Sequence, residues 1–284
     1  MHRRAFIHTL GATLVAPAIA CAMPRTGVTT ARRLSRVGVQ LYSLRDAAKA
    51  NLDQTLADIA AVGYKDVELL MSNNNFGTAP TAVRAMLDRH GLRAPSTHIG
   101  TETLTQIDRA ADEARILGHK YLVLANVPDE GRKSLDGIRS WADRLNRAGE
   151  AARKHDLWIG FHDEPQDFVT LEGQVAYDVM VARLDPSLVR LQLDTGNALL
   201  GGRDPLDLMN RYGDRYWSFH IKDAPAMRAE HDTELGKGVL DLRAILSRVK
   251  NIDDKLVFVE QESYSTTPLE SVRRDYDYIS KLTF

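Results

Sequence analysis

Three glycines set a regular interval in the first half of this sequence. Gly63, Gly91 and Gly118 lie 28 and 27 residues apart, and each follows a stretch of helical periodicity and precedes a short apolar run. Over 51–62, for example, apolar residues recur three and four positions apart, and a glycine after the last periodic residue is a typical helix stop. The interval is about the length of one helix plus one strand. The spacing therefore predicts a repeated helix–strand unit.

The same alternation continues toward the C-terminus. Strands are predicted at 37–44, 64–70, 92–99, 119–125, 157–162, 189–194, 216–222 and 255–262, with a helix after each. Such strands pair in parallel, and eight units in about 250 residues fit a closed (β/α)8 TIM barrel. The alternative is an open doubly wound sheet, but QLYSLRD stands where such a sheet would carry a glycine-rich phosphate loop. We expect 35–284 to be a single barrel domain.

Composition narrows the classes of protein to which the chain can belong. The formal net charge of -1 shows no basic excess, which disfavours nucleic-acid binding. Cys21 is the single cysteine, so a disulfide framework and a thiolate zinc site are excluded, and a metal would need His, Asp and Glu ligands. We expect no transmembrane segment. The sequence is compatible with a monomer and with a homo-oligomer.

Residues 1–26 have the pattern of an export signal and leader. Arg3 and Arg4 precede a short apolar run over 10–19, too short to span a bilayer, and Ala-Ile-Ala stands before Cys21. The arginine pair followed by Ala-Phe-Ile is similar to a twin-arginine signal, which predicts the twin-arginine export machinery and a periplasmic or cell-envelope location. Cys21 could accept a lipid, although Ala18 is a poor match to such sites. The alternative is an inert leader.

Polar residues gather at the C-terminal ends of the predicted strands, where a barrel carries its active site. They are Glu68, His98, His162, Asp163, Glu164, Asp194, His220, Lys222, Asp223, Glu260 and Glu262. Side chains alternate along a strand, so Asp194, His220 and Glu260 converge if their faces point inward, together with one group near 162–164. Carboxylates and imidazoles without a thiolate suit Mn²⁺, Mg²⁺, Co²⁺ or Zn²⁺, and a cation offsets the desolvation of clustered carboxylates.

Each of these residues also has a simpler interpretation. His220 could be a core histidine bonded to a backbone carbonyl, and His98 could be a loop residue. Glu68 could cap a helix or pair with Arg45, and Lys222 with its neighbour Asp223 could form a surface ion pair of little energetic value. The order of the strand-end residues along the chain, more than any one of them, favours a metal site.

Seven motifs together resemble the sugar phosphate isomerase/epimerase family of the xylose-isomerase-like barrel superfamily. They are VQLYSLRD, DVEL, GFHDE, LQLDTGN, FHIKD, LGKGVLD and FVEQE, and the resemblance covers nearly all of 35–284. It implies a divalent metal held by four strand-end residues, and Asp194, His220 and Glu260 match three of these positions. At the fourth position Glu164 is favoured over His162 because it restores a carboxylate. Since both lie on one face, one could bind metal and the other substrate.

The resemblance also implies the chemistry. Glu164 and Glu260 would form an acid/base pair that moves the proton next to a sugar carbonyl, and the metal would stabilise an enediolate. Asn197 stands three residues after Asp194, where the epimerases carry a substrate-binding histidine, and this departure puts epimerase specificity in doubt. The candidates for binding substrate hydroxyls are His162, His98, Glu68, Lys222, Asn197, Gln40 and Arg228.

We therefore expect a divalent-metal-dependent isomerase or epimerase acting on a sugar or a sugar derivative. The predicted export disfavours a phosphorylated substrate. It also leaves open a metal-dependent lyase or hydrolase acting on an oxidised (3-keto) glycoside, which would use the same proton chemistry. A non-catalytic sugar-binding barrel is the third alternative, and the complete set of ligand-type residues argues against it.

Overall fold

Residues 31–284, the part of the chain that this computed structural model describes, form a closed parallel barrel. The predicted export signal and Cys21 lie outside the described residues. Around the barrel the strands are β1 (Gly38–Gln40), β10 (Leu256–Val259), β9 (Tyr216–Ile221), β8 (Val189–Asp194), β5 (Trp158–His162), β4 (Tyr121–Leu124), β3 (Arg93–Ile99) and β2 (Asp66–Leu70). The prediction of a single-domain TIM barrel is confirmed.

The first strand closes the barrel by pairing on both sides. Val39 lies opposite Val67 of β2 and Val259 of β10, both in parallel register. β1 is shorter than the predicted strand 37–44, because the Gln40 side chain accepts a hydrogen bond of 3.2 Å from the Tyr42 backbone N–H and starts a 3-10 helix over Leu41–Leu44. The chain therefore leaves the barrel wall directly after Gln40.

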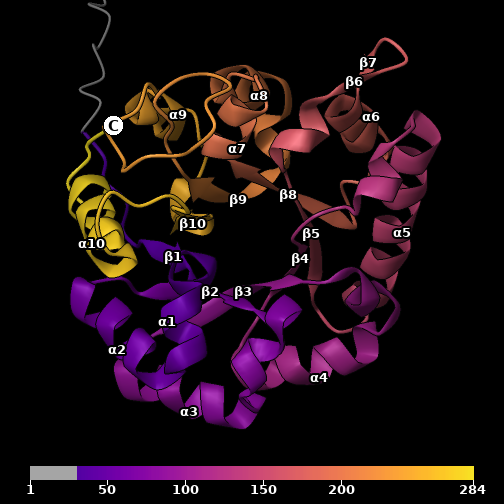
Figure 1. Cartoon of the computed structure of the whole chain (residues 1–284). Coiled ribbons are helices and arrows are strands. Elements are labelled where there is room, and N and C mark those ends of the chain that lie inside the picture. Colours follow the sequence, from indigo (N-terminus) through magenta and orange to yellow (C-terminus); the bar gives the residue numbers. More distant parts are fainter. Residues whose placement is uncertain (1–30) are drawn as a thin grey trace, which may run out of the picture. The chain divides into compact units, whose positions relative to one another are not determined.

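Helices surround the barrel and cover its strands (Figure 1). They are α1 (Arg45–Ala50), α2 (Leu52–Val62), α3 (Pro80–His90), α4 (Ile107–Leu117), α5 (Leu135–Arg153), α6 (Ala176–Arg183), α7 (Thr195–Leu200), α8 (Pro205–Tyr212), α9 (Leu242–Ser247) and α10 (Pro268–Ile279). A two-stranded hairpin of β6 (Thr170–Leu171) and β7 (Gln174–Val175) lies between β5 and α6. Among the described residues, no helix is both long and apolar enough to cross a membrane.

The predicted glycine stops end α2, α3 and α4. Gly91 has φ +65° and Gly118 has φ +85°, in the left-handed region that side chains disfavour. Gly63 also has positive φ, and a Cβ there would lie 2.6 Å from the Tyr276 ring. Glycine at these positions lets the chain turn directly from each helix into the next strand.

The apolar core lies between the barrel and its helices and is formed by buried Val, Leu and Ile from both layers. The interior of the barrel differs, because several of the side chains that point into it are polar and buried. They include Gln40, Glu68, Ser96, His98, His162, Gln192, Ser218 and His220. A barrel interior is usually filled by branched apolar side chains, so this polar filling indicates where the functional site lies.

Candidate metal centre and active site

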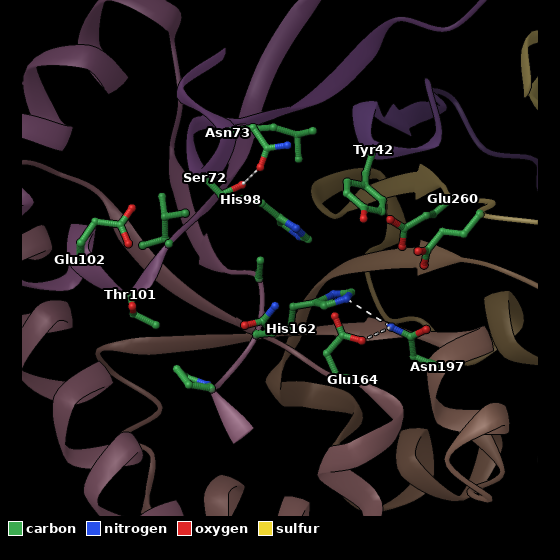
Figure 2. A pocket seen from close by; sticks show the side chains of 17 residues that line it. Tyr42, Ser72, Asn73, His98, Thr101, Glu102, His162, Glu164, Asn197 and Glu260 are labelled. Atoms are coloured by element: carbon green, nitrogen blue, oxygen red, sulfur yellow. Dashed lines mark hydrogen bonds between the residues drawn. The ribbon is translucent and has the colours of Figure 1, made fainter. Parts of the chain in front are cut away.

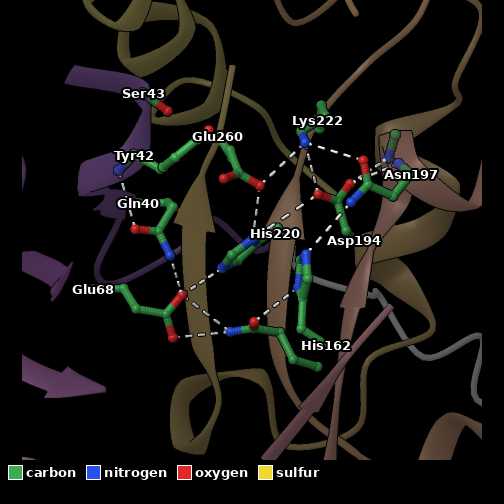
Figure 3. Close-up of polar contacts among 12 residues, drawn as sticks. Gln40, Tyr42, Ser43, Glu68, His162, Asp194, Asn197, His220, Lys222 and Glu260 are labelled. Carbon is green, nitrogen blue, oxygen red and sulfur yellow. Dashed lines mark hydrogen bonds and ion pairs between the residues drawn. The ribbon is translucent and has the colours of Figure 1, made fainter. Parts of the chain in front are cut away.

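Four buried side chains meet at the C-terminal end of the barrel (Figure 3). One ligand-type atom from each of His162, Asp194, His220 and Glu260 lies within 4.8 Å of all the others. His162 and Asp194 end β5 and β8, His220 lies in β9 opposite Asp194, and Glu260 directly follows β10. The convergence expected of Asp194, His220 and Glu260 is thus present in the structure.

The contacts within this cluster are short. The His220 Nδ1 atom lies 2.9 Å from Glu260 Oε2 and 3.9 Å from Asp194 Oδ2. The Lys222 ammonium lies 3.0 Å from Asp194 Oδ2, 3.2 Å from Glu260 Oε2 and 2.7 Å from Glu262 Oε1. Lys222 is 1% exposed, so the alternative of a surface ion pair is wrong. Its charge offsets part of the repulsion among the carboxylates.

Asp194 presents one oxygen to the cluster and uses the other to cap a helix. Its Oδ1 accepts the backbone N–H groups of Gly196 and Asn197 at 2.8 and 2.9 Å, at the start of α7. Within residues 31–284 its buried Oδ2 accepts no hydrogen bond, and its charged neighbours are the Lys222 ammonium at 3.0 Å and His220 Nδ1 at 3.9 Å. An under-satisfied carboxylate oxygen among two imidazoles and a second carboxylate is the donor set that divalent metals such as Zn²⁺ or Mn²⁺ use. The four residues therefore fit a divalent cation.

A second group of ligand-type atoms overlaps the first. His98, His162 and His220 also have ring nitrogens within 4.8 Å of one another. However, His98 Nε2 lies 3.0 Å from Gln192 Oε1 and 3.3 Å from Glu68 Oε2. These two acceptors engage that nitrogen, and we assign His98 to the wall of the site rather than to the ligand set.

The geometry brings His162, and not Glu164, into the cluster. β5 ends at His162, and Glu164 is the N-cap of the 3-10 helix Pro165–Phe168, where strand alternation no longer determines the direction of a side chain. Its Oε2 atom lies 3.5 Å from Asn197 Nδ2. Glu164 lies outside this group of four and faces the cavity beside the cluster, so its role as the fourth ligand stays a prediction (Figure 2).

Two of the glutamates that border the cavity, Glu164 and Glu260, have opposite pKa shifts. Burial raises the pKa of Glu164 to about 8, against the lowering effect of the Lys222 charge. Burial would also raise the pKa of Glu260, but Lys222 and His220 hold it well below the usual range. At neutral pH this end of the barrel therefore holds a protonated carboxyl group and an ionised one.

A cavity of about 520 Å³ opens above the cluster (Figure 2). Of the predicted substrate-binding residues, His98, His162 and Asn197 line it. The lining also includes residues from loops that the sequence analysis did not single out, namely Tyr42, Ser72, Asn73, Thr101, Glu102 and Asn126. Glu102, Glu164, Glu260 and Glu262 all line the cavity, whereas none of the described residues that line it is Lys or Arg. The cavity is therefore acidic and polar.

Four of the predicted substrate-binding residues do not line this cavity. Gln40 and Glu68 lie beneath the cluster, where the Gln40 amide donates to Glu68 Oε2 at 2.7 Å. Lys222 is buried among carboxylates, and Arg228 is exposed with its side chain beside Gly202. Glu68 is fully buried against His220, so neither the helix cap nor the pairing with Arg45 is correct.

Asp223, the neighbour of Lys222, organises the loop after β9. Its two carboxylate oxygens accept backbone N–H groups of Ala224, Gly236, Gly238 and Leu240, at 2.9 to 3.2 Å. The glycines belong to the LGKGVLD motif, and a Cβ on Gly238 would lie 2.1 Å from Asp223 Oδ1. The motif therefore shapes this loop around a buried carboxylate.

Comparisons with known proteins agree with this architecture. The family model described as xylose isomerase-like TIM barrel matches residues 56–282. An inosose dehydratase of Geobacillus kaustophilus is 26% identical over 274 residues, covering 81% of this chain and 87% of that protein. The crystal structure of a sugar phosphate isomerase/epimerase from Parabacteroides distasonis has a TM-score of 0.76 at 23% identity, over 90% of this chain and 99% of that one. The crystal structure of the IOLI protein with a bound zinc atom has a TM-score of 0.67 at 18% identity, over 87% and 98%.

Proposed function

Since this chain belongs to the xylose isomerase-like TIM barrel family, we propose that it is a divalent-metal-dependent enzyme that moves the proton next to the carbonyl of a sugar derivative. The observation that carries the proposal is the convergence of His162, Asp194, His220 and Glu260 within 4.8 Å, at the base of a cavity that Glu164 also lines. A sugar-binding barrel without chemistry would have no need to bury two carboxylates and a lysine together.

The four cluster residues would hold the metal, and the bound metal would polarise the carbonyl oxygen and favour loss of the neighbouring proton. Glu164 and Glu260 are the carboxyl groups placed to move that proton, because both border the cavity. Lys222 holds the Glu260 carboxylate in place through its contact of 3.2 Å. Asn197 donates to the Asp163 carbonyl at 3.0 Å and lies beside Glu164, which fixes one wall around the reacting carbon.

Two outcomes follow from the same first step. In an isomerase or epimerase the proton returns to the neighbouring atom or to the opposite face of the same carbon. In a lyase the bonding pair left by the proton expels a substituent from the next carbon, and that group leaves with a proton. The similarity to inosose dehydratases favours elimination as a second candidate, because an inosose is a keto-cyclitol and its dehydration loses water beside a carbonyl.

The lining of the cavity supports an uncharged substrate. Glu102 and Glu262 add two carboxyl groups to those of Glu164 and Glu260, and the described lining contains no Lys or Arg to bind a phosphate. Hydroxyl groups match the neutral donors and acceptors that remain, such as Asn73 and Thr101. The export predicted from residues 1–26 would place the reaction outside the cytoplasm, where unphosphorylated sugars are the available substrates.

Metal analysis combined with solvent-deuterium exchange tests this function. We expect about one divalent metal per chain and deuterium uptake at the carbon next to the carbonyl, across a panel of keto-sugars, keto-cyclitols and 3-keto-glycosides. Uptake without loss of a group would assign an isomerase or epimerase, and release of water or of an aglycone would assign a lyase. A protein that binds no metal, or that binds metal and exchanges no proton on the whole panel, contradicts the proposal. Asp194→Asn is the inactive control.

A further inference from the structure

We propose that Glu68 is a positioning residue that, directly and through Gln192, fixes which ring nitrogen carries the proton on His220 and His162. Each imidazole then presents its bare nitrogen to the metal. The inference rests on the proposed function, because it concerns the same metal. It assigns a role to the polar layer of Gln40, Glu68 and Gln192, which does not line the cavity. Figure 3 shows Gln40 and Glu68 beside His220.

The carboxylate of Glu68 is surrounded by donors. Oε2 accepts from Gln40 Nε2 at 2.7 Å and Oε1 from Gln192 Nε2 at 3.0 Å, and Ser96 Oγ donates to Oε1 as well. His220 Nε2 lies 2.5 Å from Oε2. An ionised carboxylate can only accept, so the proton of His220 must be on Nε2. The nitrogen that faces Asp194 and Glu260 is then Nδ1, which would bind a metal in place of the proton that it shares with Glu260 in the metal-free protein.

Gln192 determines in the same way which nitrogen of a second imidazole, that of His162, carries the proton. Its amide nitrogen donates to Glu68 and, at 2.7 Å, to Ser218 Oγ, which directs its amide oxygen the opposite way. That oxygen lies 3.0 Å from His162 Nδ1. Because an amide oxygen can only accept, His162 carries its proton on Nδ1, and its Nε2, which lies 3.4 Å from Asn197 Nδ2, is the nitrogen that can bind the metal. The orientation of Gln192 depends on Glu68, since an amide alone could face either way.

A purely structural role does not account for this layer. Glu68 is fully buried in a barrel interior, where branched apolar side chains fill space without the desolvation penalty of a carboxylate. It does not line the cavity, so it does not contact substrate. A carboxylate that accepts the second N–H of a metal-binding histidine is a recurrent arrangement in metal sites, and its loss weakens metal binding by roughly 10–100-fold.

Glu68→Gln is the sharpest variant, because it keeps the size of the side chain and replaces one acceptor with a donor. The new amide NH₂ would face Gln40, Gln192 or His220, all of which donate. Either His220 moves its proton to Nδ1 or the Gln192 amide turns over, and each change removes a bare nitrogen from the metal. We expect the Kd for Zn²⁺, measured by competition with a chromophoric chelator, to rise roughly 10–100-fold.

Asp66→Asn is the matched control. Asp66 lies two residues earlier on β2, and its carboxylate pairs with Arg93 at 2.8 Å, away from the cluster. The same carboxyl-to-amide change there is expected to leave the Kd for Zn²⁺ within about twofold. An equal loss of affinity in both variants would show a general effect of disturbing β2 and would overturn the role of Glu68.

A measurement on the wild-type protein keeps the inference testable if Glu68→Gln does not fold. Long-range ¹H–¹⁵N NMR of the zinc-loaded protein is expected to show His220 protonated at Nε2 and His162 protonated at Nδ1. The opposite tautomer on either ring overturns the inference. If the wild type binds no divalent metal, neither zinc nor manganese, magnesium or cobalt, the proposed function itself fails. If it binds zinc and Glu68→Gln binds equally well with unchanged tautomers, only the inference fails.

Discussion

Each end of the barrel buries a histidine, and the pKa of the histidine is raised at one end and lowered at the other. At the C-terminal end His220 lies between Glu68 and Glu260, and although burial lowers its pKa, the two carboxylates raise it well above the usual value. At the N-terminal end His119, just before β4, is 2% exposed, and its Nδ1 contacts the Ala94 carbonyl at 2.6 Å. Burial lowers the pKa of His119 to about 4. The partners of an imidazole, more than its depth, decide its charge.

The two ends of the barrel also differ in the partners of their buried or half-buried cations. Lys222 lies among the carboxylates of Asp194, Glu260 and Glu262. Arg190, near the start of β8, stacks on two indoles instead, with its guanidinium carbon 3.8 Å from the ring centroid of Trp158 and 4.3 Å from that of Trp217. The C-terminal end therefore places charged groups where a metal and a substrate can contact them. At the N-terminal end the charge of Arg190 lies against aromatic rings. We therefore expect changes at the first end to affect the reaction and changes at the second to affect stability.

Asp194→Asn is expected to give the largest effect. The amide oxygen can still cap α7, so local structure is kept, but the nitrogen that replaces Oδ2 can neither bind a metal nor attract Lys222. We predict a loss of kcat/KM of roughly 10³-fold or more, about 4 kcal/mol of transition-state stabilisation. The free energy of unfolding of the metal-free protein should fall by roughly 1–3 kcal/mol, because the variant removes one carboxylate from the buried Lys222 while Glu260 and Glu262 still pair with it. Steady-state kinetics measure the loss of kcat/KM, and urea unfolding measures the change in stability. Activity within tenfold of wild type would contradict the role of Asp194 as a metal ligand.

Glu164→Gln separates proton transfer from metal binding. Because His162 and not Glu164 belongs to the cluster, the variant should keep its full metal content. Loss of a general acid or base lowers kcat by roughly 10²–10⁴-fold. Kinetics together with metal analysis of the purified variant decide the question. Loss of metal along with activity would restore Glu164 as a ligand, and full activity would remove it from the chemistry.

The sequence predicted the barrel and three members of the cluster, since both depend on periodicity. Strand alternation brings Asp194 and His220 to one face, and the structure shows them opposite each other on β8 and β9. Alternation could not place Glu164, because the strand ends two residues earlier. Gln192 stands two residues before Asp194 and so shares its inward face, but its partner Glu68 is 124 residues away. The cavity walls come from loops, where no periodic pattern relates a residue to its neighbours.

At the N-terminal end, His119 predicts a pH dependence of stability. Its folded pKa of about 4 lies below the ordinary value of 6.5, so the unfolded chain binds more protons between these values. The contribution of His119 is therefore complete above pH 6.5 and is lost as pH falls toward 4, by roughly 3 kcal/mol in total. His119→Asn removes this titration. Urea unfolding of the metal-free proteins between pH 4 and 7 should show a shallower decline for the variant than for wild type; equal slopes would contradict the prediction.

Arg190→Met gives the smallest effect and tests whether the two ends are independent. Methionine keeps much of the apolar contact with Trp158 and Trp217 but removes the positive charge from their faces. Each stack is worth about 0.5–1 kcal/mol at a partly exposed site, so the free energy of unfolding should fall by roughly 1–2 kcal/mol. Metal affinity and kcat/KM should stay within about twofold, because Arg190 belongs to the start of β8 and Asp194 to its end.

Arg190→Lys, which keeps the charge on a smaller and more hydrated group, should lie between wild type and Arg190→Met in unfolding free energy. If Arg190→Met instead weakened metal binding as much as Glu68→Gln, the strand would transmit strain along its length, and the division between a reactive end and a stabilising end would not hold.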